Sequence, residues 1–145
     1  MKATLLKIYG SLLIPIITFF APIYVMVFLV GLATIVDTVF GIWKAKSLGE
    51  EVSSKLCRKG LVPKIKSYVT IVLLLFVADY YIVNELTKLF IDVDFISTKL
   101  VSLGLIVIEV KSMDESFEKV KNYSFIGKLY DNLRNIKKVK DDMNS

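Results

Sequence analysis

The chain has 145 residues, of which 54% are hydrophobic and 23% are charged, and its mean hydropathy is +0.60. A water-soluble domain of this length has too little interior for so many apolar side chains, and their bunching into long runs is typical of a chain that crosses a bilayer. The sequence has no His and one Cys, Cys57, which excludes an intrachain disulfide, a Cys/His zinc site and His-based catalysis. With no Gly-rich phosphate loop either, we expect no enzyme, no catalytic residues, no metal and no cofactor.

Four apolar runs are candidate transmembrane helices, over about residues 8–20, 23–43, 68–83 and 95–110. A crossing needs about 20 residues, with a range of about 17–25, and only the second run meets this without flanking residues. The fourth run is the weakest, because Lys99 and Glu109 lie within it. The sequence therefore predicts an all-α polytopic membrane protein, with three to four transmembrane helices in a domain over residues 1–116.

Ala21 and Pro22 separate the first two runs. Pro disfavours helical geometry in the residue before it, so a tight hairpin here would give four spans. The alternative is one kinked helix over residues 8–43, about 54 Å long at 1.5 Å per residue. That exceeds a bilayer core of about 30 Å, so part of it would lie in the interface and three spans would remain. A signal peptide is a further interpretation of the first run, but no small-x-small cleavage site precedes the second.

The charges between the runs predict the orientation. The segment 44–67 and the tail after Val110 are basic, whereas the segment between the third and fourth runs is mildly acidic. The positive-inside rule places both basic segments in the cytoplasm, so four spans predict N-in and C-in, and three spans put the N-terminus outside. The net charge is +5, and the basic residues flank the apolar runs, which favours anionic lipid headgroups over nucleic acid as a partner. The basic residues expected at the membrane surface are Lys55, Arg58, Lys59, Lys64, Lys137, Lys138 and Lys140.

Three ionisable residues, Asp37, Asp79 and Glu109, lie within the predicted spans. A carboxylate there is costly unless it is paired, hydrated or protonated. Asp37 lies on a stripe of small residues, which lets helices approach closely and bond across the contact. We interpret it either as a functional residue at a helix seam, within the protein or between copies, or as one satisfied by a Thr or Lys of its own bundle. The predicted seam comprises Gly31, Thr34, Asp37, Thr38, Gly41 and Ala45.

The other two acidic residues have simpler interpretations. Asp79 is followed by Tyr80 and Tyr81, so we assign it to an interfacial aromatic belt. Glu109 lies near the cytoplasmic end of the fourth run beside Lys111, so local pairing and snorkelling account for it.

Residues 117–145 form a basic cytoplasmic tail. Within it, residues 124–140 predict an amphipathic helix that lies on the membrane surface or packs on a partner helix. A frayed, solvated tail is the alternative interpretation. The apolar positions at helical spacing are Ile126, Leu129, Tyr130, Leu133 and Ile136.

Three sequence elements occur in a recognisable order. Asp37-Thr-Val-Phe-Gly41-Ile-Trp-Lys-Ala45 closes the second run, a loop with Ser53, Ser54, Gly60 and Lys64 follows, and Glu109-Val-Lys-Ser112-Met-Asp-Glu115-Ser116 comes late. This order resembles the phage holin family that includes the clostridial toxin-secretion holins. The resemblance covers roughly residues 23–117, and the tail is longer and more basic than in that family.

The resemblance implies a function. Such proteins accumulate in the bacterial cytoplasmic membrane, assemble into homo-oligomers and form lesions through which an endolysin, or a toxin, leaves the cell, followed by host lysis. Endolysin is then a functional partner, with no direct contact implied. The alternatives are a non-lytic membrane scaffold that recruits a partner through its basic tail, and a small channel or transporter subunit.

Overall fold

The computed structural model describes residue 11 and residues 13–143, with the side chains of Leu56 and residues 137–143 left out. In this part of the chain every element is helical, which confirms the all-α prediction. Residues 13–20 are helical and lead into the 3₁₀ turn η1. The elements are η1 (Ala21–Ile23), α2 (Tyr24–Ser47), α3 (Ser54–Ala78), the wider π-helical turn η2 (Asp79–Val83), α4 (Asn84–Thr87), α5 (Ile96–Lys121) and α6 (Phe125–Met143).

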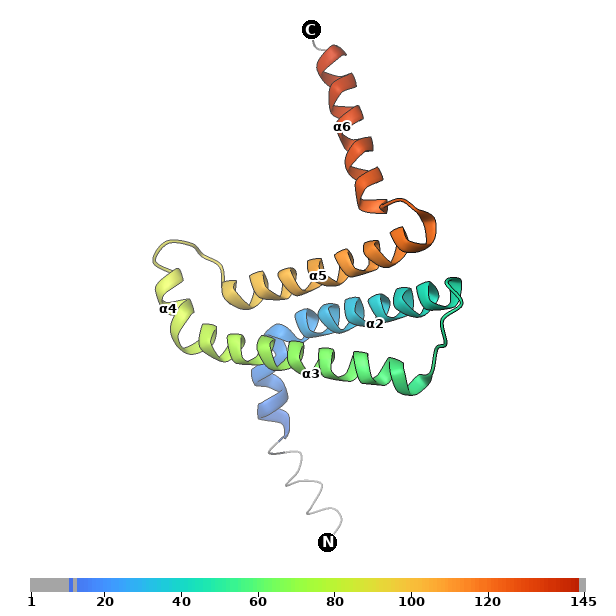
Figure 1. Ribbon diagram of the computed structural model, residues 1–145. Coiled ribbons are helices and arrows are strands. Elements are labelled where there is room, and N and C mark those ends of the chain that lie inside the picture. The colour runs from blue at the N-terminus through green and yellow to red at the C-terminus, as the bar shows by residue number, and fades with distance from the viewer. Residues whose placement is uncertain (1–10, 12, 144–145) are drawn as a thin grey trace.

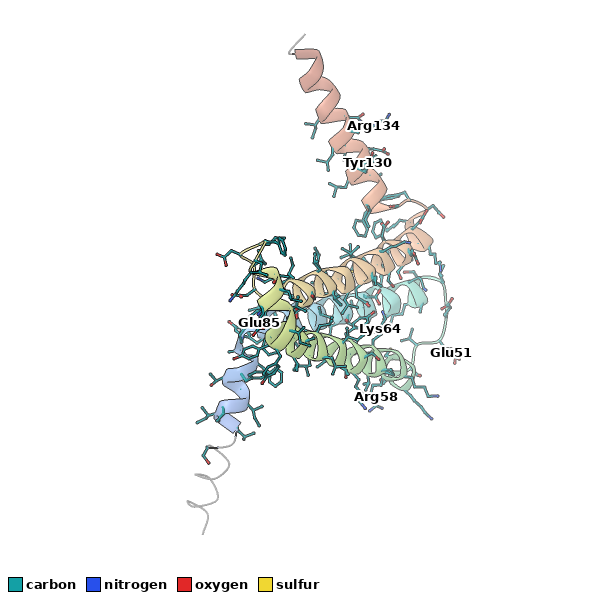
Figure 2. The ribbon with its side chains drawn as sticks, turned by 90° about the vertical axis from the view of Figure 1, so that its left-hand side faces the viewer. Glu51, Arg58, Lys64, Glu85, Tyr130 and Arg134 are labelled. Carbon is teal, nitrogen blue, oxygen red and sulfur yellow. The ribbon has the colours of Figure 1, made fainter. Side chains whose placement is uncertain are left out.

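Three long helices, α2, α3 and α5, lie side by side as a bundle (Figure 1). The chain reverses direction between α2 and α3 and again between α3 and α5, so α3 runs antiparallel to the other two. We call the end that holds residues 44–58 and the C-terminal end of α5 the basic end, and the end that holds η1, η2 and α4 the Asp79 end. Figure 2 shows Glu51 and Arg58 at the basic end and Glu85 at the Asp79 end. The buried apolar core is Ile23, Val30, Val72, Phe76 and Leu105.

Two helical stretches, Leu13–Ser47 and Cys57–Thr87, are long and apolar enough to cross a membrane. In the most apolar window of each, only 11% of the residues are buried, whereas the core helix of a soluble protein would be mostly buried. Large apolar side chains such as Phe28, Ile35 and Leu74 instead face outward. The described chain therefore has two candidate membrane-crossing helices that expose apolar surface.

The helices extend beyond the apolar runs. Of the predicted loop 44–67, only residues 48–53 lie outside α2 and α3, and α5 continues past residue 116 to Lys121. Apolar runs mark the stretch suited to lipid, while the helix itself continues through polar residues that reach water or headgroups. The ends of the helices therefore do not coincide with the ends of the apolar runs.

The tight hairpin at Ala21–Pro22 is not formed. The chain passes through η1 with Pro22 in its first turn, and residues 13–20 leave the bundle steeply instead of packing back along α2 (Figures 1 and 2). The Phe19 ring lies 5.2 Å from Phe76 and 5.1 Å from Tyr80, between centroids. These contacts fix the point at which residues 13–20 leave the bundle, and the arrangement is that of the kinked helix. Residues 8–10 and 12 of the first run lie outside the described residues.

Helix α6 leaves the basic end in the direction opposite to residues 13–20 (Figure 1). Its start is attached to α5, because the Asp114 carboxylate accepts hydrogen bonds from Ser124 Oγ at 2.6 Å and from the Phe125 amide at 2.8 Å. The Ser124 hydroxyl in turn accepts a bond from the Gly127 amide at 2.8 Å, as an N-cap residue does. The apolar side chains Ile126, Leu129, Tyr130, Leu133 and Ile136 remain exposed.

Candidate functional site

A cluster of charged side chains joins the three long helices near the basic end. Lys64 Nζ on α3 lies 2.8 Å from Asp37 Oδ2 on α2 and 2.8 Å from Glu109 Oε2 on α5. Tyr68 Oη donates a hydrogen bond of 2.6 Å to the other oxygen of Glu109. We call these four residues the ion cluster; Figure 2 labels Lys64 within it.

Local helix geometry explains the convergence. Lys64 and Tyr68 lie one turn apart on α3, so both reach the same carboxylate on α5. Glu109 is completely buried, and each of its oxygens has a donor. A buried carboxylate is tolerated when it is paired and hydrogen-bonded in this way. One ammonium thus serves two carboxylates, and it holds α3 against both α2 and α5.

The ion cluster borders a hollow of about 390 Å³ at the basic end. The hollow is lined by Asp37 and Lys64 together with Ser112, Ser116 and Cys57 among others. The Lys64 side chain is 37% exposed, whereas that of Asp37 is 12% exposed. Lys64 is therefore partly accessible beside the hollow, whereas Glu109 is completely buried.

The predicted helix seam is only partly a contact within one chain. Thr34 is buried, but its hydroxyl donates to the Val30 carbonyl at 2.8 Å, and Thr38 donates to Thr34 in the same way. Only Asp37 of the predicted seam bonds across to another helix in the described structure. A Cβ added at Gly31 or Gly41 would meet nothing within 4 Å, so neither glycine is needed for close packing here. Ala45 lines the hollow.

Asp79 lies far from the ion cluster along the bundle and forms a second polar contact. Its Oδ2 accepts bonds of 2.7 Å from both the backbone amide and the hydroxyl of Thr98, in the first turn of α5. A carboxyl group at this position caps the helix from outside. Asp79 is completely buried, while Tyr80 and Tyr81 beside it are exposed, and its assignment to an interfacial aromatic belt stays a prediction.

The basic residues divide into two groups. Lys55, Arg58 and Lys59 are exposed on the first turns of α3. Lys64 was predicted among them but turns inward, and it takes the place of Lys111 as the partner of Glu109. The side chains of Lys137, Lys138 and Lys140 lie outside the described residues.

Sequence reasoning missed Tyr68 and Thr98 as partners. Tyr68 carries a signal, since it follows Lys64 by four residues and therefore lies on the same face of a helix. Thr98 carries none, because its pairing with Asp79 depends on how α5 packs on η2.

Comparison with protein-family models, with curated proteins and with solved structures found no match to this chain.

Proposed function

We propose that this chain is a holin-like protein of the bacterial cytoplasmic membrane. In this proposal it accumulates as a helical bundle, associates with further copies, and rearranges at a set time into lesions. An endolysin, or a toxin, then passes to the cell wall and the host lyses.

One observation carries the proposal. The three elements of the holin resemblance are separated along the sequence, yet a charged residue from each meets in the ion cluster: Asp37, Lys64 and Glu109. Ser112, from the late element, lines the adjoining hollow. Residues that form one site support an interpretation in which the three elements belong to one functional unit.

We propose three membrane spans. α2, α3 and α5 have 24, 25 and 26 residues, so each is about 36–39 Å long at 1.5 Å per residue, enough to cross a core of about 30 Å. Residues 48–53 and α6 then lie in the cytoplasm, as the positive-inside rule favours. The steep departure of residues 13–20 at the Asp79 end favours a segment along the outer surface, and hence an N-terminus outside.

The ion cluster suggests how such a bundle is held and released. Lys64 pairs with carboxylates on two other helices, so in the closed bundle both carboxylates have a cation beside them. When Lys64 separates from them, the carboxylates require water, which is available from the hollow beside them. Association of several opened bundles around that water would produce a lesion wide enough for protein.

The test is inducible expression in a bacterium that also makes a cytosolic endolysin without an export signal. The proposal predicts abrupt lysis only when both proteins are present. Asp37→Asn should change the time of lysis, because it removes one of the two carboxylates held by Lys64. Continued growth with both proteins present, or solute leakage without lysis as for a channel subunit, would contradict the proposal.

A second candidate is a non-lytic scaffold, which the exposed apolar residues of α6 favour. Deletion of residues 124–145 separates the two. A holin bundle without α6 should still permit lysis with endolysin, whereas a scaffold should lose its partner.

A further inference from the structure

The two sides of α6 differ in polarity. At about 3.6 residues per turn, the exposed apolar residues of this helix share one side, and Asp131 falls on the opposite side. We call the first the apolar side of α6; its residues are Ile126, Leu129, Tyr130, Leu133 and Ile136. It continues over about three turns of the helix.

Cations flank the apolar side of α6. By the same helical spacing, Lys128 lies beyond one margin and Arg134 beyond the other, and both side chains are exposed. Three further lysines follow in the sequence, at positions 137, 138 and 140. Long basic side chains beside an apolar stripe keep their stems in apolar surroundings while their charged ends reach phosphate groups. An apolar side between cations, with an acidic residue opposite, is typical of a helix that lies in the interface of a bilayer.

The start of α6 lies among aromatic side chains at the basic end. The Phe117 ring of α5 stacks on Trp43 of α2, with centroids 5.8 Å apart. It also contacts Tyr123 and Phe125, at 5.3 and 5.7 Å. The hydrogen bonds to Asp114 hold α6 at this cluster. Aromatic residues gather where a membrane meets water, so α6 starts at the depth of that interface.

The direction of α6 separates lipid from other occupants of its apolar side. In both views α6 runs across the direction of the bundle helices (Figures 1 and 2). A helix that crosses the direction of membrane-spanning helices runs along the membrane surface. Binding to lipid requires this direction, whereas an arm that recruits a soluble protein is not restricted to it.

We propose that α6 binds the cytoplasmic surface of the membrane that its own bundle crosses, with anionic phospholipid headgroups as its ligand. The apolar side enters the boundary of the acyl chains, Lys128 and Arg134 contact phosphate groups, and Asp131 faces water. Because Asp114 bonds α6 to α5, this binding holds the cytoplasmic end of α5 at the headgroups. The inference rests on the proposed crossing of the membrane by α2, α3 and α5, and not on lysis.

Fluorescence quenching of the full chain in lipid nanodiscs, one chain in each disc, tests the proposal. In a Cys57→Ser background a single fluorophore is attached at Leu133→Cys or at Asp131→Cys, both of which are exposed positions. In discs that contain phosphatidylglycerol, we expect nitroxide-labelled lipid to quench the Leu133 label and aqueous iodide to quench the Asp131 label. Discs of phosphatidylcholine alone should shift the Leu133 label toward quenching by iodide. So should the combined substitutions Lys128→Gln and Arg134→Gln.

A label at Leu74→Cys, an outward position on α3, is the control for insertion of the bundle. If lipid quenches the Leu74 label while iodide quenches the Leu133 label, the proposal is overturned and a protein partner is left to cover α6. Equal quenching of the Leu133 and Asp131 labels would overturn it as well, because a frayed tail has no sides.

Two further results would count against the proposal. Burial of the Leu133 label only in discs with two chains would assign the apolar side of α6 to a second copy. Equal lipid quenching with and without phosphatidylglycerol would exclude anionic headgroups as the ligand. The experiment needs no lysis, so its failure leaves the lytic function standing, and quenching of the Leu74 label by iodide would contradict the membrane crossing itself.

Discussion

The two ends of the bundle hold their buried acidic groups in different ways. At the basic end, Glu109 is completely buried but has a lysine and a tyrosine as donors. At the Asp79 end, the carboxyl group is equally buried, but both of its bonds come from one uncharged residue and reach one oxygen. A lysine thus serves the first group, and the start of helix α5 serves the second.

Water distinguishes the two ends as well. The ion cluster borders a hollow, and the Lys64 side chain is 37% exposed. Neither Asp79 nor Ser102 lines that hollow, and Asp79 Oδ1 and Ser102 Oγ have no partner among the described residues. The ion cluster is therefore the more accessible of the two polar contacts.

The largest effect that we expect comes from Lys64→Met. It leaves two carboxylates, which Lys64 bridges in the folded chain, without their shared cation, so the folded bundle should lose about 2–3 kcal/mol. That is less than the 3–5 kcal/mol or so of a fully buried pair, because Lys64 is partly exposed. The measurement is unfolding in mixed micelles with increasing SDS, followed by circular dichroism.

The control for this variant is Lys66→Met, which removes an exposed lysine from the same helix. It should change the free energy of unfolding by less than about 0.5 kcal/mol. Equal effects of the two substitutions would show that the ion cluster does not hold the helices together.

A smaller effect that we expect is a difference in the free energy of unfolding between two matched amide substitutions. Glu109→Gln removes a charge that Lys64 and Tyr68 contact, and should cost about 2 kcal/mol. Asp79→Asn keeps an oxygen that can accept both bonds from Thr98, and should cost less, about 1 kcal/mol. The same unfolding measurement applies, and a larger loss from Asp79→Asn than from Glu109→Gln would reverse the comparison.

The sequence was sufficient for the parts of the fold that depend on composition. Long apolar runs predicted helices with exposed apolar surfaces, and Pro22 marked a change of direction. Whether the chain forms a hairpin or a kinked helix at Pro22 was not predictable from this residue alone, because a proline is compatible with both. Packing of Phe19 on Phe76 and Tyr80 accompanies the kink, and these residues are distant in sequence.

In the candidate site, too, the features that depend on composition were predictable and those that depend on packing were not. Asp37 and Glu109 were identifiable because acidic residues are rare within apolar runs. Lys64 was assigned to the membrane surface, because it lies in the basic segment 44–67 between two apolar runs. The helix instead continues through Pro63 and turns Lys64 inward. Which lysine pairs with which carboxylate depends on the packing of α3 on α2 and α5, which no local pattern specifies.

The account requires the two ends to lie on opposite faces of the membrane, and one labelling experiment tests this directly. Cys57, the single cysteine, lines the hollow at the basic end. Before lysis, a membrane-impermeant maleimide should label it in inside-out vesicles and not in spheroplasts. In a Cys57→Ser background, Asp94→Cys should show the opposite pattern, because Asp94 is exposed beyond the Asp79 end. Labelling of both cysteines from the same side would contradict the account.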